Sequence, residues 1–259
     1  MRIIIIYFDG FAGSGNRYEE RPSPLFTQLK LSIEEDHVYK GAAERILTLP
    51  NGLSFDFHYF IDLHKESLLK LEKKLSTHQE TRNNPFQYKT GDCNRWLKEL
   101  AIAIKNNPSE YAALVLLDPF GMQIDWESIE CLRGTRCDVW ILVPTGVIVN
   151  RLLEKSGELK HIAKLQSFFG LSEEEIKSFF YRKDNQKTLF GDEEIIEKIS
   201  DPIQKISELY VQRLKTIWSH VTEQPLRLLN TRGTPIYHFV FASNNQNAVK
   251  IAKQIIAKS

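Results

Sequence analysis

The chain has 259 residues, of which 42% are hydrophobic, and its 34 Lys and Arg nearly balance 33 Asp and Glu. This composition predicts a globular, soluble protein with one large domain and an inserted subdomain, and the net charge of +1 excludes a blanket attraction to nucleic acid or membranes. Cys93, Cys131 and Cys137 form no Cys-x-x-Cys pair, which disfavours a disulfide framework and a zinc site. We expect reduced thiols in a cytoplasmic protein, because the apolar start is too short for a membrane span or signal peptide.

The first predicted element is a strand over residues 3–8, where four isoleucines precede Tyr7 and Phe8. Such a β-branched run is typical of a strand covered on both faces in a parallel sheet. It ends abruptly in Asp9-Gly10-Phe11-Ala12-Gly13-Ser14-Gly15. Clustered glycines let the backbone bend sharply and approach a ligand. The pattern favours a small-molecule site over a plain surface turn.

Strands and helices alternate along the next part of the chain. We predict helices over residues 23–34, 68–75 and 96–104, and strands over residues 58–63, 86–89, 112–117 and 139–143. This alternation indicates an α/β layer structure. Each strand finishes in an acid, a glycine or a proline, as a ligand site beyond the carboxyl ends of a parallel sheet would need.

Residues 150–222 have helical patterns throughout. Ser172 and Glu175 fit a capping box, and the apolar stripe of residues 203–221 predicts a helix packed in the core. Tyr181-Arg182-Lys183 and Lys187 are interpreted as a solvated helix end, with phosphate contact as the alternative. Residues 226–229 and 236–241 predict an antiparallel hairpin, followed by a final helix whose apolar face holds Ala248, Ile251, Ala252, Ile255 and Ile256. We therefore predict an α/β domain from residues 1–149 and 223–259, and a helical insertion over 150–222 that covers the site.

Three nucleotide-binding motifs compete for the opening turn. Gly10 and Gly15 have the spacing of a P-loop, but Asn16 and Arg17 stand where lysine and a hydroxyl residue are needed. A dinucleotide fingerprint needs a small residue where Tyr18 stands. The third motif has an acid before Gly-x-x-Gly-x-Gly and matches motif I of class I methyltransferases. There the glycines admit the methionine tail and sulfonium of S-adenosylmethionine, so Asp9, Gly10, Phe11, Ala12, Gly13 and Gly15 are predicted cofactor-binding residues.

Acids at the next two strand ends support the methyltransferase interpretation. Asp62 is placed to accept both ribose hydroxyls of an adenosyl group, although its distance from the turn requires an insertion relative to the usual spacing of about 20 residues. Asp92, in Gly91-Asp92-Cys93, is predicted to lie beside the adenine. The alternatives are an exposed strand-end acid and a common turn.

Asp118, Pro119 and Phe120 follow the fourth strand, where methyltransferases of exocyclic amines carry Asp/Asn-Pro-Pro-aromatic. In such sites a side-chain oxygen and a backbone carbonyl accept hydrogen bonds from the two N–H groups of the amine. These bonds favour the pyramidal, reactive form of the nitrogen as positive charge develops on it. The aromatic ring then stacks on the extruded base. This chain lacks the second proline. The alternative is therefore a strand end at which Asp118 caps a turn and Phe120 packs.

With these motifs in order, the chain resembles the three-Cys-motif partner family. The resemblance lies in Asp9-Gly10-Phe11-Ala12-Gly13-Ser14-Gly15, Leu117-Asp118-Pro119-Phe120-Gly121 and Pro144-Thr145-Gly146. It implies a class I methyltransferase-like fold and association with a separate three-Cys-motif protein. The family name refers to cysteines of that partner, and the resemblance brings no established substrate.

The sequence thus predicts methyl transfer from S-adenosylmethionine, most plausibly to an exocyclic amine of a nucleic acid, with Asp118, Pro119 and Phe120 presenting the amine. The rival is a cofactor-binding or non-catalytic partner subunit. A nucleotide-dependent phosphotransferase is weaker because the P-loop lysine is absent. No metal site is expected, since the seven histidines show no paired ligand spacing.

Overall fold

The structure is a computed structural model that describes residues 2–15, 42–47, 49, 53–79, 86–188 and 191–258, and for residues 77–79, 147, 183–188 and 191–195 it describes the backbone alone. The helix predicted over 23–34 lies outside the described residues. The first half alternates as predicted, with elements β1 (Ile4–Asp9), α2 (Ala42–Leu47), β2 (Phe57–Asp62), α3 (Lys65–Gln79), β3 (Phe86–Thr90), α4 (Cys93–Asn106), β4 (Tyr111–Leu117), α5 (Trp126–Glu130) and β5 (Cys137–Val143).

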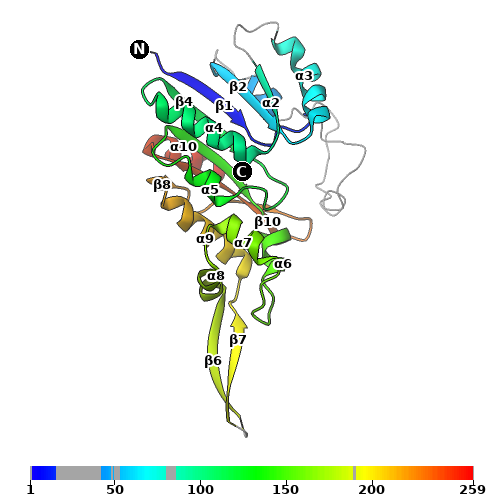
Figure 1. Ribbon diagram of the computed structural model, residues 1–259, viewed down its shortest axis with the longest axis vertical. Helices are drawn as coiled ribbons and strands as arrows, with labels where there is room; N and C mark the ends of the chain where they lie inside the picture. Colours follow the sequence, from blue (N-terminus) through cyan, green and yellow to red (C-terminus); the bar gives the residue numbers. More distant parts are fainter. Residues whose placement is uncertain are drawn as a thin grey trace.

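The central sheet is mostly parallel, as the alternation predicted (Figure 1). Within the described residues its order is β3-β2-β1-β4-β5-β10-β8, and β9 pairs with β10. All neighbours among β1 to β5 run parallel. The later strands, β8 (His220–Val221), β9 (Leu226–Leu229) and β10 (Pro235–Ser243), add an antiparallel part. The prediction of a mainly parallel sheet with an antiparallel hairpin is confirmed.

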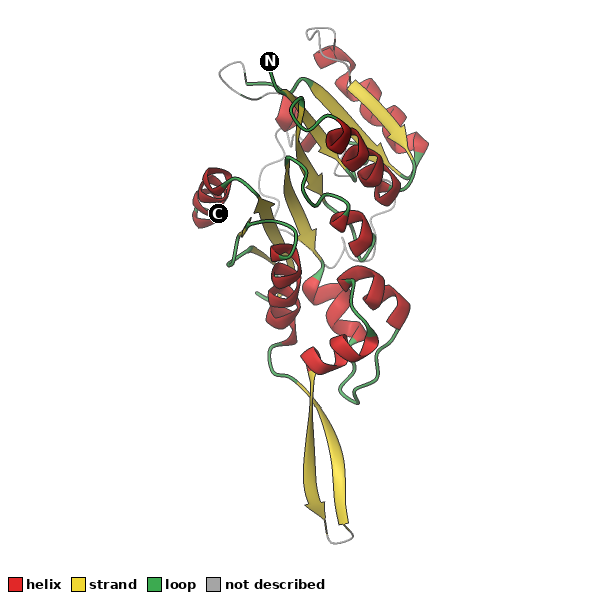
Figure 2. Cartoon of the chain, turned by 60° about the vertical axis from the view of Figure 1, so that its left-hand side comes forward, coloured by secondary structure: helices red, strands yellow, loops and turns green. Residues whose placement is uncertain are grey.

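Helices cover both faces of this sheet (Figure 2). Phe8 and Ile61 point to a core shared with α4, whereas Tyr7 and Phe60 point to a second core that α2 and α3 cover. Successive residues of a strand face opposite sides, so strands buried on both faces need continuous apolar runs. This is why the strands could be predicted from such runs. Among the described helices, none combines the length and the apolar character that crossing a bilayer requires.

The face predicted for the last helix is wrong in part. Helix α10 (Gln246–Ala257) buries Val249 and Ala252 against Phe241 of β10. Ile251 and Ile255, which the sequence places on the same apolar face, are 57% and 51% exposed. The helix therefore rests on the sheet through Val249 and Ala252, and Ile251 and Ile255 lie on its outer side.

Residues 150–222 contain helices, but not throughout. The segment follows the π-helical turn η1 (Thr145–Val149) directly and contains α6 (Asn150–Leu152), α7 (Ile162–Phe169), α8 (Glu173–Phe180) and α9 (Pro202–Lys215). The capping box of Ser172 and Glu175 is confirmed. The prediction is wrong between α8 and α9, where β6 (Tyr181–Thr188) and β7 (Gly191–Lys198) pair as an antiparallel ribbon that projects from the body (Figures 1 and 2). The basic stretch at Tyr181 thus begins a strand rather than ending a helix.

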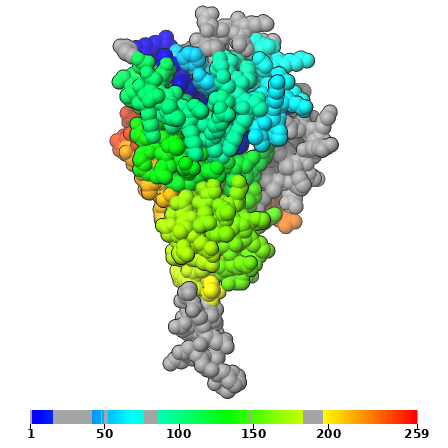
Figure 3. Space-filling view, in the orientation of Figure 1, coloured from blue at the N-terminus to red at the C-terminus, as the bar shows by residue number. Residues whose placement is uncertain are grey.

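The helical part of this segment packs directly on the sheet domain. Phe168 of α7 and Ile206 of α9 belong to the same buried cluster as Val115 and Val139 of the sheet. In the space-filling view the surface of the helical segment continues that of the domain above it (Figure 3). As predicted, the apolar stripe of α9 is buried.

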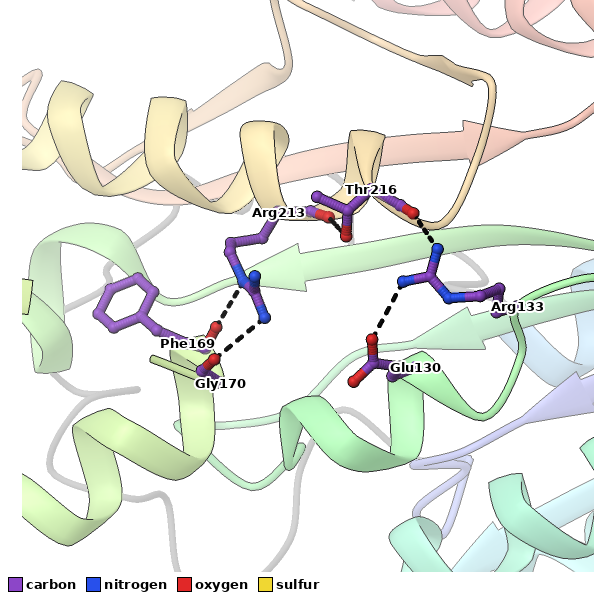
Figure 4. A network of polar contacts seen from close by, with 6 residues as sticks. All are labelled: Glu130, Arg133, Phe169, Gly170, Arg213 and Thr216. Carbon is purple, nitrogen blue, oxygen red and sulfur yellow. Dashed lines mark hydrogen bonds and ion pairs between the residues drawn. The ribbon is translucent and has the colours of Figure 1, made fainter. Parts of the chain in front are cut away.

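Two arginines form hydrogen bonds between α9 and its neighbours (Figure 4). Arg213 donates from Nε to the Phe169 carbonyl (2.9 Å) and from Nη2 to the Gly170 carbonyl (3.0 Å). Its guanidinium carbon lies 4.4 Å from the ring centroid of Trp126. Arg133, in the turn after α5, donates to the Thr216 carbonyl at the end of α9 and to Glu130.

We expect Arg213→Ala to lower the free energy of unfolding by about 2 kcal/mol, because it removes a ring contact and leaves two carbonyls unpaired. Arg213→Lys should recover little, since an ammonium cannot bridge both carbonyls as a planar fork does. Urea titration measures both. The control is Lys177→Ala, which removes an exposed ion pair to Glu173 and should cost less than about 0.5 kcal/mol. Equal effects of the two alanine variants would contradict this account.

Candidate functional site

The candidate site lies at the carboxyl end of β1, where the strand order reverses. The chain proceeds from β1 to β2 and β3 on one side, and then returns to place β4 and β5 on the other. Such a switch point opens a crevice beyond the carboxyl ends of the central strands. Asp9 is level with Phe60 and Leu116 in the parallel register. Asp62 and Asp118 therefore lie two residues further along their strands, on either side of Asp9.

The glycine-rich turn after β1 bonds to both neighbouring strands. Its backbone N–H groups donate to protein acceptors at four successive residues: Gly10 to the Leu116 carbonyl (2.9 Å), Phe11 to Asp9 Oδ1 (3.2 Å), Ala12 to the Ile61 carbonyl (2.9 Å) and Gly13 to Asp62 Oδ2 (3.1 Å). The turn is thus closed by the protein itself, and these donors already have acceptors.

Glycine is required in this turn for two different reasons. A Cβ on Gly10 would lie 2.5 Å from Cys93 Sγ and 2.8 Å from Leu117 Cδ2, so the backbone passes close to α4 and β4. Gly15 has φ of +71°, which side chains disfavour. Lys74 of α3 donates to the Gly15 carbonyl (2.7 Å) and pairs with Glu44 (2.8 Å). Both ends of the turn are therefore fixed.

Asp9 is a buried acid, only 3% exposed. Its Oδ2 accepts a hydrogen bond from the Tyr7 hydroxyl (3.3 Å). Burial raises the pKa of Asp9 to about 7; the Phe11 N–H and Tyr7 hydroxyl oppose the rise, whereas the charges of Asp118 and Asp62 add to it. These acids are close enough to repel one another, and a bound cation would relieve that repulsion.

Asp62 and Asp92 already make structural hydrogen bonds. Asp62 accepts from the Gly13 N–H and, at 2.7 Å, from the His64 N–H. A carboxylate has about four lone-pair positions, so both oxygens retain acceptor capacity. Asp92 caps α4, accepting from the Asn94 backbone N–H (2.9 Å) and side-chain amide (3.1 Å). The alternative for Asp92 was a common turn, and in the structure this turn is the N-cap of α4.

The loop after β4 exposes both a carboxylate and an aromatic ring. Asp118 is exposed, yet the protein packed around its carboxyl raises its pKa through desolvation. Pro119 is buried, and the Phe120 ring is 71% exposed. The alternative in which Phe120 packs is thus contradicted.

Three residues of this site were missed by sequence reasoning. Tyr7 precedes Asp9 by two residues on the same face of β1, so strand alternation could have identified it. Cys93 lies against the turn, and burial followed by the charges of Asp92 and Asp9 raises its pKa. Tyr237 of β10 donates its hydroxyl to the Phe120 carbonyl (3.3 Å). No local sequence signal reveals that last contact.

A hollow of about 350 Å³ lies elsewhere, between α5 and α7. Its lining includes Asp125, Glu127 and Glu130 but none of the acids at the strand ends. Glu127 and Glu130 pair with Lys98 and Arg133, so the hollow carries little unbalanced charge. Across the described part of the chain, no three His, Cys, Asp or Glu side chains gather as metal ligands would.

No protein-family model and no curated protein matches this chain. What the site does must therefore be argued from its own residues.

Proposed function

We propose that this protein binds S-adenosylmethionine at the carboxyl ends of β1, β2 and β3 and transfers its methyl group to an exocyclic amine, most plausibly of a nucleic acid. The observation that carries the proposal is the glycine-rich turn. It lies at the switch point between Asp62 and Asp118, with its backbone donors from Gly10 to Gly13 bonded to protein acceptors.

These contacts favour a cationic ligand over a phosphate. Phosphate-binding loops offer free backbone N–H groups, often with a lysine. Here the Phe11 and Gly13 N–H groups donate to the carboxylates of Asp9 and Asp62 instead, and these two acids would repel an anion. A sulfonium and an α-ammonium suit the same acids. The phosphotransferase alternative is therefore weaker still.

The cofactor-binding role rests on Asp9, Gly13, Gly15 and Asp62, with Asp92 beside them. The spare acceptor capacity of Asp62 suits two ribose hydroxyls. Asp92 uses Oδ1 as a helix cap, which leaves its other oxygen for the adenine amine. The sheet order argues against the dinucleotide-binding alternative. That class has six parallel strands, whereas an antiparallel β10 lies here between β5 and β8.

The acceptor role rests on the loop after β4. S-adenosylmethionine supplies an electrophilic methyl group on sulfur. Asp118 and the Pro119 carbonyl would accept hydrogen bonds from the two N–H groups of the amine. These bonds would stabilise the positive charge that develops on the nitrogen. That charge would develop as the nitrogen bonds to the methyl carbon and the sulfur departs as a thioether. The raised pKa of Asp118 suits it to receive the proton that nitrogen then releases. The exposed Phe120 ring offers a surface for stacking the base.

The family resemblance leads to the rival proposal, a cofactor-binding or non-catalytic partner subunit of a three-Cys-motif protein. A cofactor-binding subunit also requires S-adenosylmethionine binding. The two proposals separate when purified protein is tested for methyl transfer alone and with a co-expressed partner.

Calorimetry with S-adenosylmethionine and with ATP tests the cofactor class directly. We expect binding of S-adenosylmethionine in the sub-millimolar range and none of ATP; the reverse result would end the methyltransferase proposal. Asp62→Asn should weaken S-adenosylmethionine binding about 10- to 100-fold, because charge-assisted acceptors of the ribose are lost. The matched control is Asp56→Asn: Asp56 also accepts a backbone N–H, from Ile5 (2.8 Å), but at the opposite end of the strands. Equal losses in both variants would contradict the ribose role.

A further inference from the structure

The amino end of strand β10 lies near the proposed site. It runs antiparallel to β5, with His238 opposite Val143 at the carboxyl end of β5. Tyr237 precedes His238 and therefore lies just beyond the carboxyl end of β5. Asp9, Asp62 and Asp118 lie at the carboxyl ends of the neighbouring parallel strands. An element far away in sequence thus reaches the loop after β4.

Tyr237 holds the backbone of that loop. The side chain is buried, with the residue 7% exposed, and its hydroxyl donates to the Phe120 carbonyl at 3.3 Å. The Phe120 N–H donates to Gln123 Oε1 at 2.9 Å. Both backbone groups of Phe120 are therefore bonded, while its ring remains exposed. This arrangement fixes where the ring stands without covering it.

The beginning of β10 is itself anchored to the segment after β5. Thr145 Oγ1 and His238 Nδ1 lie 2.8 Å apart, and both side chains are buried. Gly146 leaves no room for a Cβ against the backbone of Pro235 and Ile236. Tyr237 therefore stands between an anchored strand and a loop that its hydroxyl restrains.

We infer that Tyr237 is a positioning residue for the methyl acceptor, acting through its hydrogen bond to Phe120 to keep Asp118, the Pro119 carbonyl and the Phe120 ring in one arrangement. This inference rests on the proposed function. Burial, followed by the charge of Asp118, raises the pKa of Tyr237, so its hydroxyl stays protonated and able to donate.

The test is Tyr237→Phe, which removes only the hydroxyl. We expect amide hydrogen exchange over residues 118–123 to rise about tenfold, as the loss of one hydrogen bond implies. Methyl transfer to a mixed-sequence single-stranded DNA oligonucleotide should fall about 10- to 100-fold in kcat/KM. The affinity for S-adenosylmethionine, measured by calorimetry, should stay within about twofold.

The matched control is Tyr210→Phe, because the hydroxyl of Tyr210, in α9, is buried with no hydrogen-bond partner among the described residues. It should change none of the three readouts. Unchanged exchange and transfer in Tyr237→Phe would overturn the inference, as would an equal loss of cofactor binding and transfer, which a purely structural role produces. If the wild-type protein binds no S-adenosylmethionine, the proposed function fails, and the exchange measurement alone decides whether Tyr237 holds the loop.

Discussion

Replacing Asp118 with alanine is expected to lower methyl transfer about 100- to 1000-fold, because the developing charge on the acceptor nitrogen loses its principal counter-charge. The affinity for S-adenosylmethionine should change little, since Asp118 lies on the acceptor side of the crevice. Asp118→Asn should retain part of the activity, because an amide oxygen still accepts one N–H bond. Transfer of a labelled methyl group to DNA, RNA and lysate proteins measures the effect.

The control for Asp118 is Asp138→Asn. Burial also raises the pKa of Asp138, but this acid lies near the amino end of β5, away from the carboxyl ends that form the site, and it accepts from Ser243 (2.5 Å). It should leave transfer unchanged. Wild-type labelling in Asp118→Ala would remove the catalytic role from the loop after β4. Cofactor binding without any labelling until a partner is added would favour the partner-subunit proposal.

The acid at the end of β1 should make stability depend on pH. The carboxyl of Asp9 has a pKa of about 7 in the folded protein, against 3.8 as its ordinary value. Between these values the folded state keeps a proton that the unfolded state has released, so the free energy of unfolding falls as pH rises through this window. The full shift corresponds to about 4 kcal/mol, of which about 2 to 3 kcal/mol falls between pH 5 and 8.

Asp9→Asn should remove this contribution. An amide cannot ionise, still accepts from the Phe11 N–H, and faces the Tyr7 hydroxyl, which can turn to accept. Urea titrations at pH 5 and pH 8 should therefore show a smaller loss of stability in Asp9→Asn than in the wild-type protein. Parallel pH dependences of the two proteins would refute the burial of an ionisable group here.

Asp9 should also couple ligand binding to the release of a proton. A cation bound beside Asp9 favours its charged form, so binding should release a proton near neutral pH and strengthen as pH rises from 6 to 8. Calorimetry in two buffers of different ionisation enthalpy measures the proton. In Asp9→Asn the release should vanish.

The parallel sheet could be predicted because the burial of its strands is evident from their local sequence. A strand covered on both faces reads as a continuous apolar run, and acids and glycines mark where β1, β2 and β4 end. The ribbon of β6 and β7 offered no such signal. The sequence of β6 is polar and has no continuous apolar run, so the pattern resembled a solvated helix end.

The contacts made by β10 could not be predicted for a different reason. Tyr237 meets Phe120 only because an antiparallel strand lies beside β5, which depends on the order of the whole sheet rather than on nearby residues. The exposed Ile251 and Ile255 of α10 show the same limit. An apolar stripe of a helix identifies a candidate face, but the neighbours decide which part of it is covered.

The place of β10 within the sheet also bears on how the protein is made. During synthesis, β5 is complete at residue 143, but the strand that covers its free edge does not begin until residue 235. Throughout that interval a ribosome-bound chain presents an open, apolar sheet edge of the kind that recruits other strands. The nascent protein should therefore need shielding by a chaperone, or a pause in elongation, until the missing strand emerges.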